Sequence, residues 1–341
     1  MLDRLIRWSL ENRLLVVIAT VLLLVAGGYT AVSMPVDVFP DLTAPTVTVL
    51  TEAHGMATEE VETLVTFPLE TAVNGAAGVR RVRSSSAQGI SIVWIDFDWG
   101  TDIFRARQIV NEKLQLTSGQ LPEGADVPVL APITSIMGEI LLVGVTAPDS
   151  LLMEARTEAD WTVRRRLLAV PGVAQVIPIG GEVRQYQVLV RPERLRAYGL
   201  GLSAVVEAAT ESNRNASGGV YRSGGQEVLV RGLGRARNVA EIGRTVVTTR
   251  EGVPVLLEDV ADVRIGPRYR FGVASVNAEP AVVLAIQKQP GANTLELTDR
   301  VDAELDLIAP QLPEGIAIER DMFRQADFIS LAVDNVIHAL R

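Results

Sequence analysis

The sequence contains no cysteine in its 341 residues. A disulfide framework and a metal site built from thiolates are therefore both excluded. Any part of the chain outside the cytoplasm must depend on hydrophobic cores that are stable without cross-links. Lysine is also scarce, since it occurs only at Lys113 and Lys288. The net charge of −9 argues against nucleic-acid binding, which depends on positive charge.

Charge is absent from Leu14 to Val36, a largely apolar run of 23 residues. A helix rises about 1.5 Å per residue, so roughly 20 residues cross the hydrocarbon core of a bilayer. Gly27 and Gly28 are compatible with a spanning helix, in which glycine is common. Two alternatives are a buried core helix of a soluble protein and a cleavable signal peptide, whose apolar core is shorter. The run predicts a transmembrane helix.

The charges on either side of this run predict its orientation. Three arginines precede it, namely Arg4, Arg7 and Arg13, whereas Asp37 and Asp41 follow it. Because positive charge stays on the cytoplasmic side, the N-terminus is expected inside and the chain from Pro35 to about Phe323 on the other side of the membrane. Residues 1–12 combine apolar and charged side chains, which suits a short helix at the inner interface of the lipid bilayer.

The rest of the chain contains an internal repeat. The pattern GVxxV occurs at 78–82 and 172–176, and LPEG occurs at 121–124 and 312–315. Gly78 and Gly124 are 46 residues apart, whereas Gly172 and Gly315 are 143 residues apart. The second copy therefore contains 97 extra residues, which we place between about 180 and 275.

Hydrophobic periodicity predicts the same order of elements in both copies. In the first we expect strands at 45–52, 79–87, 89–98 and 126–131, with helices at 58–73 and 102–116. In the second we expect strands at 139–146, 173–179, 281–288 and 315–320, with helices at 150–168 and 294–309. The order β-α-β-β-α-β is that of a ferredoxin-like unit. The predicted fold class is α+β, with one transmembrane helix and a second unit interrupted by an α+β insertion.

The insertion includes a glycine- and asparagine-rich stretch at 210–232, flanked by strand-like residues. Such a segment forms either an ordinary surface hairpin or an arm that reaches into a neighbouring subunit. After the last predicted strand, apolar residues recur at helical spacing and continue to Arg341. We expect this helix to lead into a second membrane span.

Several polar residues are candidates for cation binding, and each also has a simpler interpretation. Asp96 and Asp98 could share a cation, or lie on the wet face of a half-buried strand. His54, near Met56, could bind a soft metal, or be an ordinary loop histidine. Met137 and Met153 are expected to fill a core, Arg164–Arg166 to lie on a solvated helix face, and Gly180–Gly181 and Gly224–Gly225 to form turns. His338 has no candidate partner nearby in the sequence. No nucleophile and base are paired in a recognisable pattern, so an enzyme is not expected.

Several motifs together resemble the resistance–nodulation–division (RND) transporters over essentially the whole chain. They are, in order, PVDVFPDL, TEEVETLVTFPLE, GTDIFRARQIVNEKL, NRNASGGVYRSGGQEVLVRG and VLLEDVADVRIG, together with the two LPEG motifs. The segments PITSIMGEI and DIFRARQ are most similar to the heavy-metal efflux branch, the CusA/CzcA type.

This resemblance implies a division of the chain into subdomains. An interfacial helix and the first transmembrane helix would occupy 1–36, and a first porter subdomain 37–134. The second porter subdomain would be formed by 135–180 and 273–322, with a docking subdomain inserted at 181–272 and the helix toward a second span at 323–341. The resemblance also implies that the loop of the docking subdomain enters the next protomer, with Asn213, Asn215, Gly218, Gly219 and Tyr221 as its docking residues.

The resemblance further implies a proton-driven efflux pump for heavy-metal cations, either Cu/Ag or Zn/Co/Ni. Its expected partners are two further copies in a homotrimer, a periplasmic membrane-fusion adaptor and an outer-membrane channel. No cofactor is expected, and the proton-carrying and metal-binding residues would lie beyond Arg341, so none is assigned here. The alternatives are an RND pump for hydrophobic drugs and a single-span periplasmic scaffold or adaptor.

Overall fold

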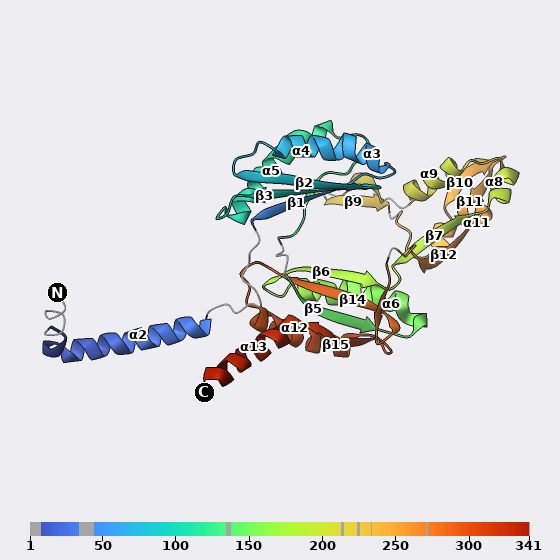
Figure 1. Cartoon of the computed structure of the whole chain (residues 1–341). Coiled ribbons are helices and arrows are strands. Elements are labelled where there is room, and N and C mark those ends of the chain that lie inside the picture. Colours follow the sequence, from blue (N-terminus) through green and yellow to red (C-terminus); the bar gives the residue numbers. More distant parts are fainter. Residues whose placement is uncertain are drawn as a thin grey trace.

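The structure is a computed structural model, and it describes residues 8–33, 44–133, 138–212, 215–223, 226–232, 234–270 and 272–340 (Figure 1). It contains one long apolar helix, two helix-and-sheet bodies and a smaller third body. The α+β class predicted from the sequence is confirmed. Of the predicted interfacial helix at 1–12, residues 1–7 lie outside the described part.

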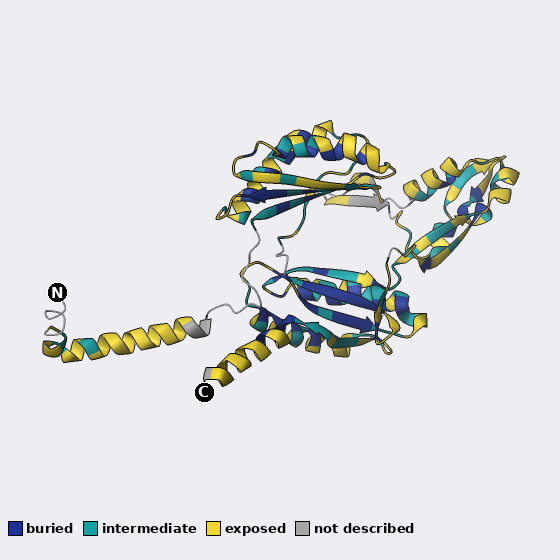
Figure 2. Ribbon diagram, viewed as in Figure 1, coloured by how far each residue is buried: buried dark blue, intermediate teal, exposed yellow. Residues whose placement is uncertain are grey.

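Helix α2 (Arg13–Ser33) contains most of the uncharged run. Its stretch Arg13–Thr30 has a mean hydropathy of 2.0 and none of it is buried against the rest of the protein. Figure 2 draws most of the visible side of this helix as exposed. It is long and apolar enough to cross a membrane, and its full exposure does not match the alternative of a buried core helix.

The first body has a four-stranded antiparallel sheet in the order β2-β3-β1-β4. Its strands are β1 (Thr46–Glu52), β2 (Val79–Ala87), β3 (Ile90–Phe97) and β4 (Val129–Leu130). The last strand is shorter than the predicted 126–131, because Pro128 has no amide hydrogen to donate to a neighbouring strand.

Helices cover one face of this sheet. They are α3 (Thr58–Val61), a π-helical turn at Glu62–Thr66, α4 (Phe67–Val73), α5 (Ile103–Thr117) and a 3₁₀ turn at Ser118–Gln120. The Asp102 carboxylate accepts a hydrogen bond from the Arg105 amide at 2.9 Å and so caps α5. Buried side chains of β1 and β3, such as Val49, Ile95 and Phe97, pack against these helices and form the core.

The second body has a sheet in which β6 pairs with β14, β14 with β5, and β5 with β15, all antiparallel. The strands are β5 (Glu139–Thr146), β6 (Val173–Gly180), β14 (Glu279–Lys288), β15 (Ala317–Arg324) and the short edge strand β13 (Ala274–Val276). The two sheets have the same strand order: β6-β14-β5-β15 in the second corresponds to β2-β3-β1-β4 in the first.

The helices of the second body also lie on one face of its sheet. They are a 3₁₀ turn at Asp149–Leu151, α6 (Leu152–Glu158), a π-helical turn at Ala159–Val163, α7 (Arg164–Leu168), α12 (Thr294–Ile308) and a 3₁₀ turn at Ala309–Gln311. Asn293 caps α12 by accepting from the amides of Leu295 and Glu296. The core joins elements on both sides of the insertion, for example Val163 with Val301 and Leu284.

A third body lies between β6 and β13 in the chain. Its strands are β7 (Arg184–Val190), β10 (Val246–Arg250), β11 (Val253–Leu256) and β12 (Ala261–Pro267). The same stretch of chain contains β8 (Ala216–Ser223) and β9 (Gln226–Gly232), which pair with each other as a hairpin and with no other described strand. Its helices are α8 (Pro192–Tyr198), α9 (Leu202–Ser212), α10 (Val239–Gly243) and α11 (Leu257–Val260). Val205, Val255, Leu257 and Val260 form its own small core.

Two neighbouring connections join this third body to the second. Strand β7 pairs antiparallel with β12, and the Arg268 amide continues the ladder by donating to the Val183 carbonyl at 2.8 Å. Arg270 also forms an ion pair with Glu182 beside these connections. The chain therefore leaves and re-enters the second body at one place.

Helix α13 (Gln325–Leu340) follows β15 without an intervening loop. The sequence placed the end of this strand at 320, whereas the structure extends it to Arg324. In Figure 1, α2 and α13 both lie on the left-hand side of the molecule.

Candidate functional sites: a hairpin, a cleft and three polar clusters

The predicted docking loop is a two-stranded hairpin formed by β8 and β9. Its register shifts between Ser217 and Val220, which places Gly218 and Gly219 at an irregularity, and Gly219 has a φ of +78°. The Tyr221 side chain is exposed. At the base, the Arg235 amide donates to the Asn215 side chain at 3.3 Å. Asn213 lies outside the described residues.

The hairpin presents apolar side chains to solvent. Val220, Tyr221 and Val228 are each at least half exposed. The core of the third body includes none of these three residues. These three side chains therefore contribute nothing to that core.

A cleft of about 380 Å³ is lined by residues of the first and second bodies. Its residues are Ile103, Phe104, Arg107, Pro132, Ile133, Ala174, Gln289 and Pro290. The Arg107 guanidinium donates to the Ala131 carbonyl at 2.6 Å, and burial lowers the pKa of Arg107 below its ordinary value. The cleft is mainly apolar, with one cation at its wall.

Asp96 is a buried, hydrogen-bonded carboxylate, and neither a shared cation site nor a solvated strand face describes it. Its side chain is only 3% exposed and accepts hydrogen bonds from Arg81 (2.9 and 3.0 Å), Thr46 (2.9 Å) and Arg83 (3.3 Å). Burial raises the pKa of Asp96, but these hydrogen bonds outweigh it and the net pKa lies below the usual value. Asp98 is exposed beyond the end of β3. The expectation of a wet strand face is therefore wrong for Asp96, because two arginines on β2 cover it.

The arginine run at 164–166 is only partly the solvated face that the sequence predicts. Arg164 donates to the Val176 carbonyl at 2.9 Å, and Arg166 forms an ion pair of 2.6 Å with Glu304 on α12. Arg165 is exposed over the Trp161 ring. Two of the three arginines therefore tie α7 to its neighbours.

The structure also gives the positions of the other residues that the sequence singled out. Met153 is half-buried and His338 is exposed on α13. Gly180 ends β6 and Gly181 follows it, both with positive φ. Met137 and Gly224–Gly225 lie outside the described residues.

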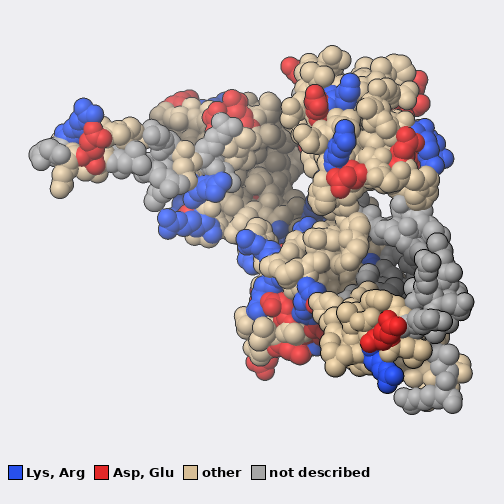
Figure 3. Space-filling view, turned by 90° about the vertical axis from the view of Figure 1, so that its left-hand side faces the viewer, with Lys and Arg blue, Asp and Glu red and all other residues tan. Residues whose placement is uncertain are grey.

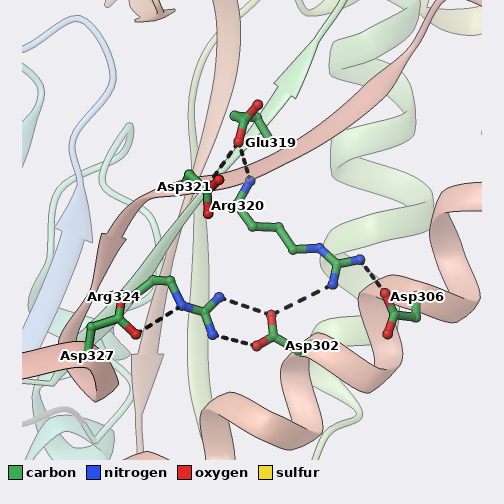
Figure 4. A network of polar contacts seen from close by, with 7 residues as sticks. All are labelled: Asp302, Asp306, Glu319, Arg320, Asp321, Arg324 and Asp327. Atoms are coloured by element: carbon green, nitrogen blue, oxygen red, sulfur yellow. Dashed lines mark hydrogen bonds and ion pairs between the residues drawn. The ribbon is translucent and has the colours of Figure 1, made fainter. Parts of the chain in front are cut away.

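A network of charged side chains links α12, β15 and the start of α13 (Figure 4). Asp302 is paired with both Arg324 and Arg320, at 2.6 and 3.9 Å. Arg320 also contacts Asp306 at 2.8 Å, and Arg324 contacts Asp327 at 3.5 Å. The sequence did not predict this network, because its members meet only when β15 packs beside α12.

A third cluster contains Glu52, His54 and Asp126. The Nε2 atom of His54 lies 3.6 Å from a Glu52 carboxylate oxygen and 3.3 Å from one of Asp126. The metal-ligating atoms of the three residues all lie within 4.8 Å of one another. Alternation along the strand could have paired Glu52 with His54, but Asp126 is distant in the sequence and carries no local signal.

The charge on the surface is mixed. Figure 3 shows acidic and basic side chains interspersed over the face that it draws, without a large area of one sign. This pattern agrees with the absence of a nucleic-acid-binding signal in the composition.

Comparison with known proteins identifies the family of the chain. The AcrB/AcrD/AcrF family matches residues 5–341. HelA of Legionella pneumophila is 36% identical over 323 residues, covering 93% of this chain and 31% of that protein. The cobalt-zinc-cadmium resistance protein CzcA of Cupriavidus metallidurans is 35% identical over 327 residues, which cover 93% of this chain and 31% of that protein. The cation efflux system protein CusA of Escherichia coli is 35% identical over 341 residues, which cover 98% of this chain and 32% of that protein.

A solved structure, the X-ray crystal structure of a heavy metal efflux pump in its crystal form II, is also similar. Its TM-score is 0.85 at 28% identity, and the match covers 97% of this chain and 33% of that one. The chain therefore spans about a third of the length of these relatives. With the family matched over nearly every residue and the backbone matched to a solved member, the chain belongs to the AcrB/AcrD/AcrF family of RND transporters, in the heavy-metal efflux branch.

Proposed function

We propose that the chain is the N-terminal part of a proton-driven RND pump that exports heavy-metal cations. The observation that carries this proposal is the backbone match to a heavy metal efflux pump over 97% of the chain, including the two similar bodies and the third body between them. Under this proposal, 37–134 and 135–180 with 273–322 are porter subdomains, and 181–272 is the docking subdomain.

The proposed location follows from α2. This exposed apolar helix would cross the inner membrane, with the arginines before it in the cytoplasm and the bodies after it in the periplasm. Helix α13 would lead toward a second span. The cleft between the first two bodies would then face the periplasm.

The proposed assembly is a homotrimer that works with a periplasmic adaptor and an outer-membrane channel. Support for the trimer comes from the β8–β9 hairpin, whose exposed Val220, Tyr221 and Val228 take no part in the core of the third body. Apolar side chains of this kind are stabilised when a partner surface covers them. The neighbouring protomer is the proposed partner.

The experiment that tests the function uses the complete gene in its own host. Deleting it should lower the tolerated concentration of at least one of zinc, cobalt, nickel, copper or silver, and the wild-type gene should restore it. Tolerance to hydrophobic drugs should not change. Unchanged tolerance to all five metals, together with a loss of drug tolerance, would favour a drug pump instead.

A coupling test separates transport from passive metal binding. In liposomes that contain the full-length protein, metal movement should require an imposed proton gradient and stop when a protonophore collapses it. Metal movement that persists without the gradient would contradict the proton-driven part of the proposal.

A further inference from the structure

We propose that Glu52, His54 and Asp126 form a binding site for a divalent cation of the Zn²⁺, Co²⁺ or Ni²⁺ class on the surface of the first body. Each of the three residues offers a metal-ligating atom. Backbone register, interatomic distances and the chemistry of the donor atoms all support this site.

The backbone brings the three residues to one face of a short antiparallel ladder. Ala53 pairs with Ala125 across this ladder. On either side of that pair, the His54 amide donates to the Gly124 carbonyl at 2.9 Å and the Asp126 amide donates to the Glu52 carbonyl at 2.7 Å. Asp126 is therefore opposite Glu52. Residues two apart on a strand share a face, so His54 lies on that face as well.

This register sets two carboxylates directly opposite each other, an arrangement that is destabilising when nothing neutralises it. The neighbouring position on the partner strand, opposite His54, is Gly124, which has no side chain and a φ of +101°. The imidazole is thus the group that both carboxylates approach, through the same Nε2 atom. A cation bound at this point would neutralise the pair.

The distances fit shared coordination better than hydrogen bonding. An N–H···O hydrogen bond spans about 2.7–3.2 Å, whereas the two Nε2 to carboxylate distances are 3.3 and 3.6 Å. Two ligands of a tetrahedral zinc ion, each bonded at about 2.1 Å, are separated by about 3.4 Å. The two observed distances lie on either side of that value, so one ion can contact the imidazole and either carboxylate without a large movement.

The donor set selects a class of ion. One imidazole nitrogen and two carboxylate oxygens suit Zn²⁺, Co²⁺ and Ni²⁺, whereas Cu⁺ and Ag⁺ prefer sulfur ligands. Two carboxylates also balance the charge of a divalent ion. The three side chains are 61–67% exposed, so water can fill the remaining coordination positions. We expect a rapidly exchanging site that captures cations from solution, in contrast to a closed structural site.

Binding by itself does not require the chain to transport anything. Its further role, as a place where the pump collects its substrate outside the porter cleft, rests on the proposed function. The experiment therefore measures binding first and metal tolerance separately.

The chain is well suited to a direct test, because His54 and His338 are its only histidines. The 1–341 chain in detergent, purified without a polyhistidine tag, is titrated with ZnCl₂ in a calorimeter. In parallel, ¹⁵N-histidine NMR follows the two imidazoles. Zinc should shift the ring signals of His54 and leave those of His338 in place.

Three substitutions sharpen the result. His54→Gln should weaken zinc binding at this site at least tenfold, and Asp126→Asn should weaken it several-fold while keeping the size of the side chain. His338→Gln is the matched control and should bind like the unmodified chain. Circular dichroism should show the same secondary structure in all four proteins, because the substituted side chains are exposed.

Two results would overturn the site: zinc affinity unchanged by His54→Gln, or zinc shifts at His338 in place of His54. A measured site together with unchanged metal tolerance in the deletion strain would instead refute the pump while leaving the site in place. A measured site, with metal tolerance lost on deletion and lowered by His54→Gln in the full-length protein, supports both.

Discussion

Arg324, the last residue of β15, donates through both terminal nitrogens to the two carboxylate oxygens of Asp302 on α12, at 3.2 and 2.6 Å. The hydrogen bonds to Asp302 raise the pKa of Arg324, burial opposes them, and the attraction of Asp302 and Asp327 adds to the rise. Since α13 begins at the next residue, this pair fixes the point at which the second body becomes the C-terminal helix.

Removing the charge of Asp302 should therefore destabilise the second body. Asp302→Asn is expected to lower the free energy of unfolding by about 1–3 kcal/mol, because Arg324 and Arg320 would lose a charged acceptor at a partly buried position. Urea denaturation of the 1–341 chain in detergent, followed by circular dichroism, measures the change. Glu227→Gln, which breaks the exposed pair with Arg222 in the hairpin, is the control and should cost less than about 1 kcal/mol. Equal effects of the two substitutions would show that the Asp302 network adds no more stability than an exposed ion pair.

Asp96 should make the first body sensitive to acid. Its pKa is lowered in the folded protein, so the ionised carboxylate stabilises the fold above the unfolded value of about 3.9, and this stabilisation is lost as pH falls through the folded pKa. Asp96→Asn should lower the thermal midpoint at pH 7 and flatten its dependence on pH between about 5 and 2.

The control for this acid dependence is Asp98→Asn, two residues along the same segment. The Asp98 side chain is exposed, so its substitution should leave the pH profile close to that of the unmodified chain. If the two variants had the same profile, the Arg81 and Arg83 contacts to Asp96 would have no measurable electrostatic effect.

The sequence predicted those features that repeat or alternate locally. The uncharged run predicted α2, and the alternation of Val93, Ile95, Phe97 and Trp99 predicted one buried strand face. The first three are buried in β3, whereas the prediction is wrong for Trp99, which lies beyond the end of the strand and is 60% exposed. The recurrence of GVxxV and LPEG located the extra residues between about 180 and 275, where the third body is found. Each of these signals depends on neighbours in the chain, which is why it could be recognised without a structure.

Contacts between distant residues could not be predicted in this way. The sequence suggested that Asp96 was solvated, because alternation places it opposite the buried residues of β3, but nothing local shows that Arg81 and Arg83 cover it. His54 was a candidate ligand without partners, since Asp126 joins it only through the ladder between Ala53 and Ala125. Such sites depend on strand register, which a single sequence specifies only weakly.

Gly180 should be intolerant of any side chain. Its φ is +77°, and a Cβ at this position would lie 2.6 Å from the Ala274 amide nitrogen and 2.8 Å from the Ala281 carbonyl oxygen, both backbone atoms of the same sheet. Gly180→Ala is therefore expected to cost more than about 2 kcal/mol, from backbone strain and from the displaced strands.

Gly199 provides the matched control for this prediction. It ends α8 with a φ of +64°, but a Cβ there would have open space. Gly199→Ala should therefore cost only the conformational strain, about 1–2 kcal/mol. Thermal unfolding of the two variants compares them directly, and a smaller loss for Gly180→Ala than for Gly199→Ala would contradict the close packing of β6 against β13 and β14.

The hairpin should matter to assembly more than to folding. In the full-length protein, Val220→Asp places a charge among the exposed apolar residues of β8, next to Tyr221. If this surface enters a neighbouring protomer, as proposed, burying the new charge is costly and the trimer should dissociate at protein concentrations where the unmodified trimer is intact. Native mass spectrometry in detergent measures the oligomeric state.

Val253→Asp, at an exposed position on β11, carries the same change outside the hairpin and should leave the trimer intact. A stable trimer for Val220→Asp would show that the hairpin does not hold the protomers together.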